Sequence, residues 1–93
     1  MPIENNMNYK ILETIKQAGR TKTVLRIIYK EKDGTSEGWH HVEPYSFRGE
    51  GESEALFAWD RAQDGIRRFT LSRIDQVELT TDNFTPRYPI EII

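Results

Sequence analysis

Cysteine is absent from the 93 residues of this sequence, which excludes a disulfide scaffold and zinc sites built on thiolates. Neither sign of charge dominates: 13 lysines and arginines stand against 15 aspartates and glutamates, for a net charge of −2. Proteins that bind nucleic acid through bulk charge are usually basic, so any such binding must come from a local patch. Apolar runs of transmembrane length and the apolar core of a signal peptide are also missing. We therefore expect a cytoplasmic protein.

The residues that are present are typical of one small globular domain. Charged residues make up 30% of the chain and aromatic residues 11%, a composition that is globular rather than disordered. The length leaves room for a single domain, residues 1–93. A domain this short buries only about 60–65% of the surface that its unfolded chain exposes, so its core is modest.

The hydrophobic spacing predicts one helix followed by about five short strands. Apolar residues recur at helical spacing from Ile11 to Ala18, so we expect a helix over about 7–18 that stops at Gly19. Runs with the alternation of strands follow. They lie at about 23–32, 36–43, 55–60, 66–74 and 76–80.

Turn and breaker residues indicate how these strands connect. Asp33-Gly34 and Asp64-Gly65 are short hairpin signals. Pro44 is expected to end the second strand, because proline cannot donate to the ladder. The strands should therefore pair as antiparallel neighbours.

A sheet this small leaves exposed edges, which curling into a barrel removes. We expect a mainly β domain, a small Sm-like or SH3-like antiparallel barrel over about 22–80, with the N-terminal helix covering one end or face. The tail, 81–93, ends in an apolar run. It is expected to add an edge strand after Pro89 or to pack on a partner chain.

The run at 66–74 sets arginines among apolar residues. Arg67, Phe69, Leu71 and Arg73 share one parity, so a strand would place them on one face. A guanidinium is costly to bury unpaired, so it reaches the rim, meets a carboxylate or binds an anion such as phosphate. The carboxylates that offer the pairing alternative lie in and around the hairpins. They are Asp60, Asp64, Asp75 and Glu78.

Other candidate residues are weaker. Trp59 and Trp39 could stack on bases, but the shared parity of Trp59 and Phe57 favours packing. His40 and His41 are adjacent in a strand and point to opposite faces, so they cannot hold one ion together, and we predict no metal site. Neither a paired nucleophile and histidine nor a pair of carboxylates in an apolar setting is evident. We predict no enzyme activity and no cofactor.

Several short blocks between about Tyr9 and Arg87 occur in an order that resembles a known family. They are Ile27-Ile28-Tyr29, Val42-Glu43-Pro44, Leu56-Phe57-Ala58, Arg67-x-Phe69-x-Leu71-x-Arg73-Ile74 and Phe84-Thr85-Pro86-Arg87. The order resembles the WYL domain, a module of bacterial transcription regulators and some defence-associated proteins. The resemblance implies an Sm-like β-barrel preceded by a helix. The tripeptide that names the family is Ala55-Leu56-Phe57 here, so Leu56 replaces its tyrosine.

The resemblance also implies a function. Modules of this family are proposed to bind negatively charged ligands, including nucleotides and nucleic-acid fragments, and to signal to an attached DNA-binding domain. Carried onto this chain, Arg67 and Arg73 are the expected phosphate contacts, with Arg68, His40 and Trp59 nearby. We therefore expect a ligand-sensing regulatory module for a nucleotide or short single-stranded nucleic acid.

Two expectations concern the partners of the domain. The sequence contains no winged-helix or helix-turn-helix segment, so we expect a stand-alone relative or an excised domain without its own DNA-binding domain. The alternative is a protein-interaction or dimerisation module whose ligand pocket has been lost. In that case the apolar residues 90–93 and an open barrel edge would dock on a partner or on a second copy.

Overall fold

A computed structural model describes residues 3–92, with side chains from residue 9 onward. Helix α1 (Ile3–Thr21) precedes five antiparallel strands. The strands are β1 (Thr23–Tyr29), β2 (Trp39–Arg48), β3 (Ala55–Asp60), β4 (Gly65–Thr70) and β5 (Ile74–Asn83), with 3-10 turns η1 (Gly51–Ser53) and η2 (Leu71–Arg73). The prediction of a mainly β domain with one N-terminal helix is confirmed.

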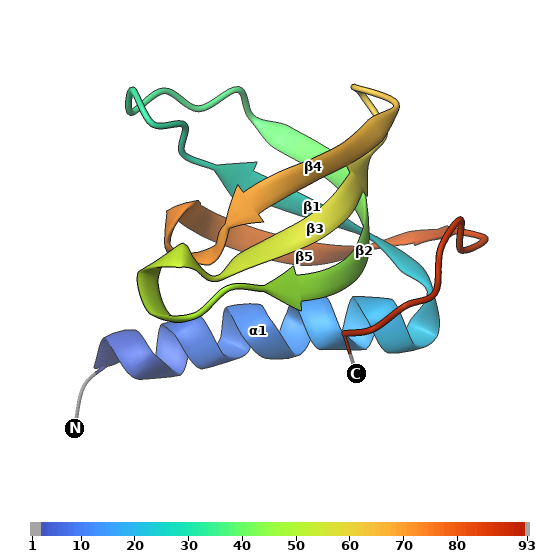
Figure 1. Cartoon of the computed structure of the whole chain (residues 1–93), viewed down its shortest axis with the longest axis horizontal. Helices are drawn as coiled ribbons and strands as arrows, with labels where there is room; N and C mark the ends of the chain where they lie inside the picture. The colour runs from blue at the N-terminus through green and yellow to red at the C-terminus, as the bar shows by residue number, and fades with distance from the viewer. Residues whose placement is uncertain (1–2, 93) are drawn as a thin grey trace.

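The strands form one curled sheet in the order β4-β3-β2-β1-β5, and α1 lies along one side of it (Figure 1). Strands β4 and β5 are the two edges and do not pair with each other, so hydrogen bonds do not close the barrel. The helix contacts β1, β2 and β5. Its fully buried Ile15 and Ala18 join a core whose largest fully buried side chain is Phe69 of β4.

The helix is longer than the spacing predicted and does not stop at Gly19. A Cβ on Gly19 would meet Ile90 and Ile92 at 3.4 and 3.5 Å, so the glycine serves close packing inside the helix. The helix ends at Thr21, and Lys22 takes the left-handed conformation with φ 54°. Thus the glycine marks where the chain's own C-terminal segment docks rather than a helix end.

Strand β2 continues through Pro44, so the prediction that proline ends it is wrong. Pairing with β1 finishes at Leu25 and Val42, so the ladder on that side needs no donor from Pro44. The pairing with β3 shifts register between Pro44 and Ser46. Proline is tolerated in sheets at such bulges and unpaired edges.

The two hairpins differ from each other in length. Asp64 has φ 55° and donates its amide to Asp60 O at 2.8 Å, so β3 and β4 are joined by a short turn as predicted. Strands β1 and β2 are instead joined by a longer loop, 30–38, and β2 begins only at Trp39. The Asp33-Gly34 turn lies within this loop, where Gly34 has φ 88°.

The C-terminal segment, 84–92, packs on the chain itself, and the predicted edge strand after Pro89 is not formed. Glu91 donates its amide to Tyr45 O at 2.7 Å, and Ile92 is 4% exposed against α1. Ile92 thus packs in the chain's own core, whereas Ile93, the last residue of the predicted apolar run, lies outside the described residues. Across residues 3–92, no helix has both the length and the apolar character needed to cross a membrane.

Candidate functional site

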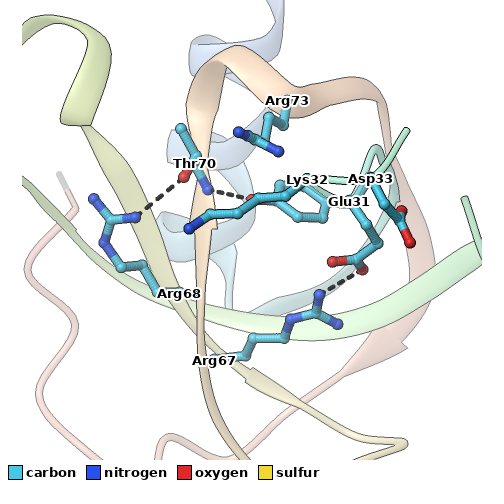
Figure 2. A pocket seen from close by; sticks show the side chains of 8 residues that line it. Glu31, Lys32, Asp33, Arg67, Arg68, Thr70 and Arg73 are labelled. Carbon is cyan, nitrogen blue, oxygen red and sulfur yellow. Dashed lines mark hydrogen bonds and ion pairs between the residues drawn. The ribbon is translucent and has the colours of Figure 1, made fainter. Parts of the chain in front are cut away.

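A cavity of about 450 Å³ opens where the end of β1, loop 30–38, edge strand β4 and η2 meet (Figure 2). Four lining side chains are cationic and two are carboxylates. The lining residues are Tyr29, Glu31, Lys32, Asp33, Arg67, Arg68, Thr70 and Arg73. The three arginines that the sequence singled out therefore do meet at one cavity.

Arg67 is largely enclosed by its neighbours. Its side chain is 19% exposed, and its guanidinium lies 4.9 Å from the ring centre of Phe69 and 5.5 Å from that of Tyr29. Its Nη2 donates to Glu31 Oε2 at 2.6 Å, and its Nη1 lies 3.8 Å from Asp60 Oδ2. The pairing alternative was right for Asp60, but the sequence did not reveal Glu31.

Arg68 and Arg73 have no carboxylate partner among the described side chains. Arg68 lies on the other side of β4 from Arg67 and donates to Ser53 O at 2.6 Å and to Thr70 Oγ1 at 3.1 Å (Figure 2). Arg73 lies in η2, because the strand predicted over 66–74 ends at Thr70. Arg73 therefore reaches the cavity from this turn. The prediction had instead placed it on a strand face shared with Arg67.

Lys32 completes the cationic lining, and Figure 2 shows it extending across the cavity toward Thr70. Lys32 was not among the residues that the sequence singled out. Tyr29 was also missed: it is 6% exposed, and its hydroxyl accepts the amide of Thr70 at 3.0 Å. Leu56, at the place of the family tyrosine, is fully buried opposite Phe69 and does not line the cavity.

His40 lies behind the cavity rather than in its lining. The ring is 8% exposed, sits 5.9 Å from Phe69, and has Nδ1 3.5 Å from Asp60 Oδ2. Asp60 is fully buried; its Oδ1 accepts the amide of Ala62 at 3.0 Å. In the described part of the chain, neither His40 Nε2 nor Asp60 Oδ2 has a hydrogen-bond partner. Buried polar atoms without partners are rare and call for a physical reason.

Trp59 does not line the cavity, although the register places Arg68 on the same face of the sheet as Trp59 and Arg67 on the other. Trp59 pairs in register with Ile66, whereas Arg67 pairs with Ala58, and adjacent pairs face opposite sides of the sheet. The guanidinium of Arg87 lies 4.1 Å from the centre of the Trp59 ring. The ring also packs on the second apolar cluster, so Trp59 is a packing residue.

A second buried carboxylate, Glu43, lies on the same side of the sheet as Trp59. Glu43 is 2% exposed and accepts from Arg61 Nε, Arg87 Nε and the Tyr45 hydroxyl, each at 3.2 Å. The Tyr45 hydroxyl accepts in turn from the amide of Arg87 at 2.8 Å. Burial raises the pKa of Tyr45 above its usual value, and the Arg87 amide partly offsets this rise. This network is internally satisfied.

A family model and a solved structure both match this chain. The model of the WYL domain matches residues 10–79, about three quarters of the chain. The fold is similar to proteasome accessory factor B/C (PafBC) of Arthrobacter aurescens, with a TM-score of 0.75 and 18% identity. The alignment covers 92% of this chain but only 14% of that chain, so the likeness concerns the fold of one domain. No curated protein matches the sequence.

Proposed function

This chain belongs to the WYL domain family, and from that premise we propose that it is a ligand-sensing regulatory module. The ligand we propose is anionic: a nucleotide or a short single-stranded nucleic acid. The observation that carries the proposal is the group of cations around one cavity, Lys32, Arg67, Arg68 and Arg73, in a chain whose net charge is −2. A local patch of this kind is what anion recognition requires in a chain that is not basic overall.

Three of these cations are available for phosphate oxygens. Arg68, Arg73 and Lys32 form no ion pair within residues 9–92, so a ligand need not break one to reach them. A guanidinium offers a planar pair of donors to a phosphate, and an ammonium acts as a point charge. The cavity of about 450 Å³ lies in the range of ligand pockets, ~300–1,000 Å³.

Arg67 takes a different part, because Glu31 already holds it at 2.6 Å. A phosphate that reaches Arg67 competes with this carboxylate. Glu31 stands at the start of loop 30–38, so displacing it changes what anchors the loop. Occupation of the cavity would thereby alter a surface segment that an attached domain or partner could detect.

The test is fluorescence anisotropy with labelled short single-stranded DNA and RNA at low and physiological salt. We expect Arg73→Ala to weaken binding and to lower the slope of log affinity against log salt by about one, since one phosphate contact is lost. Arg73 is a better probe than Arg67, because removing Arg67 would also leave the buried carboxylate of Asp60 without its guanidinium.

The matched control is Arg20→Ala, which removes an exposed arginine of α1 that does not line the cavity. It should leave both affinity and salt slope unchanged. Absence of binding at low salt, or equal losses in Arg73→Ala and Arg20→Ala, would reject the proposed site. The tail-mediated alternative gains no support, because Ile92 is buried within the chain itself.

A further inference from the structure

A second group of ligand-type side chains lies beside the cationic cavity. Glu31, Glu37 and His40 bring two carboxylate oxygens and one imidazole nitrogen to within 4.8 Å of one another. Glu31 and Glu37 stand near the two ends of loop 30–38, and His40 is the second residue of β2. The Asp33-Gly34 turn reverses the chain between them and so brings the two glutamates back to one place.

His40 provides an independent observation that this group is built to hold something. Its side chain is 8% exposed, and the β2–β1 register fixes its backbone opposite Ile27. Nδ1 lies 3.5 Å from Asp60 Oδ2, and one of the two ring nitrogens is within 4.8 Å of the carboxylate oxygens of Glu31 and Glu37. Nε2 is buried and has no hydrogen-bond partner among the described residues, and an unpaired buried polar atom costs free energy that a ligand would recover.

We propose that Glu31, Glu37 and His40 form a binding site for a divalent transition-metal cation of the Zn²⁺ class. Histidines that bind metals usually give their other ring N–H to a carboxylate, which fixes the tautomer and orients the ring. Asp60, fully buried beside Nδ1, is placed for that task. One imidazole with two carboxylates suits Zn²⁺ and its neighbours, whereas Mg²⁺ and Ca²⁺ prefer oxygen ligands.

Carboxylates gather at this place. Glu31 and Asp60 both lie against the guanidinium of Arg67, and Glu37 adds a third carboxylate beside Glu31. Ligand atoms around a tetrahedral zinc ion lie roughly 3.4 Å apart, given bonds of about 2.0–2.2 Å. Binding therefore requires the glutamates to close in slightly, and Glu37 is exposed on a loop that can do so.

Three protein ligands leave one position of the metal open, as in zinc sites that bind a further molecule. Glu31 also lines the cationic cavity, so the open position borders the space proposed for the anion. The metal site nevertheless stands on its own observations. It does not require that a nucleotide or nucleic acid binds next to it.

The experiment uses the whole chain, stripped with chelator and then titrated with Zn²⁺ by calorimetry, with Co²⁺ absorption reporting the ligand geometry. We expect one ion per chain, a tenfold or greater loss of affinity in Glu37→Gln, and no competition by excess Mg²⁺. Glu37 is exposed, so its replacement should not impair folding. The carboxylate control is Glu52→Gln, an exposed acid outside the group.

A second measurement separates this site from casual binding at the exposed neighbour His41. Nitrogen-15 spectra of the imidazoles should show Nε2 of His40 shifting on Zn²⁺ addition, with Nδ1 keeping its proton. Affinity should survive His41→Ala. The proposal is overturned if no stoichiometric binding occurs, if Glu37→Gln binds as tightly as wild type, or if His41→Ala abolishes binding.

Discussion

Two carboxylates are buried on opposite sides of one sheet, and their surroundings differ. Glu43 pairs in register with Trp59, and Asp60 with Val42, so the two acids face opposite ways. Glu43 accepts from Arg61, Arg87 and Tyr45. Asp60 Oδ2 makes no hydrogen bond, and the side-chain nitrogens of His40 and Arg67 lie 3.5 and 3.8 Å from it. Native proteins rarely leave such an atom unsatisfied. The Glu43 side is thus structural, and the Asp60 side is where ligands are expected.

The largest predicted effect is that of Arg67→Ala on stability. Asp60 is fully buried, and Arg67 is the only guanidinium near it among the described residues, so its removal should cost about 3 kcal/mol of unfolding free energy. Arg87→Ala should cost less than about 1 kcal/mol, since Arg87 is half exposed and Glu43 keeps Arg61. Urea denaturation of both variants measures the difference. Equal losses would show that the two sides are equally dependent on their cations.

Tyr45→Phe should have the next largest effect, on the satisfied side. The variant keeps the ring but leaves Glu43 without one donor and the amide of Arg87 without its acceptor. Buried groups that lose a partner cost about 1–3 kcal/mol each, partly recovered here because Glu43 retains two arginines. We expect a loss of about 1–2 kcal/mol by the same denaturation assay. An unchanged midpoint would mean that this network contributes little.

Tyr45 is also expected to make the stability depend on pH, and this effect is smaller. Because burial raises the pKa of Tyr45 in the folded chain, the neutral hydroxyl is favoured by folding. Its contribution is complete below the unfolded pKa of about 10 and is lost as the pH rises through the folded pKa. Melting temperatures followed from pH 8 to 11 should fall less steeply in Tyr45→Phe than in wild type. Parallel curves would contradict the assignment of the raised pKa to this site.

Glu31→Gln is expected to have the smallest effect on stability. Its main effect is expected on oligonucleotide binding at the Asp60 side of the sheet. Glu31 is partly exposed, so loss of its pair with Arg67 should cost no more than about 1 kcal/mol. Removing the competing carboxylate should, however, strengthen binding of a labelled oligonucleotide several-fold in chelator-treated buffer. Weaker binding in this variant would mean that Glu31 supports the ligand rather than competing with it.

The sequence predicted the features that depend on local pattern. Strand alternation correctly put Arg67 and Phe69 on one face of β4, and the parity of Trp59 with Phe57 correctly favoured packing. The alternation failed beyond Thr70, because Leu71-Ser72-Arg73 keeps the pattern of a strand while the chain folds into a 3-10 turn. A period of two residues does not by itself reveal that change.

Contacts between distant segments could not be predicted. Glu31 meets Arg67 across 36 positions of sequence, and nothing around either residue distinguishes this pairing from those with nearer acids. His40 was rightly separated from His41, but its approach to Glu37 depends on the shape of loop 30–38. The prediction at Pro44 failed for the same reason, because whether β2 tolerates a proline there depends on where its pairing with β1 ends.

The most direct test of the central claim is to map the anion site residue by residue in the nitrogen-15-labelled chain, titrated with a short single-stranded DNA at low salt. We predict that the amide signals of Lys32, Thr70 and Arg73 shift in proportion to binding, while the indole N–H of Trp59, which does not line the cavity, stays still. Shifts at Trp59 with silent cavity residues, or no shifts at all, would contradict an anion site at this cavity.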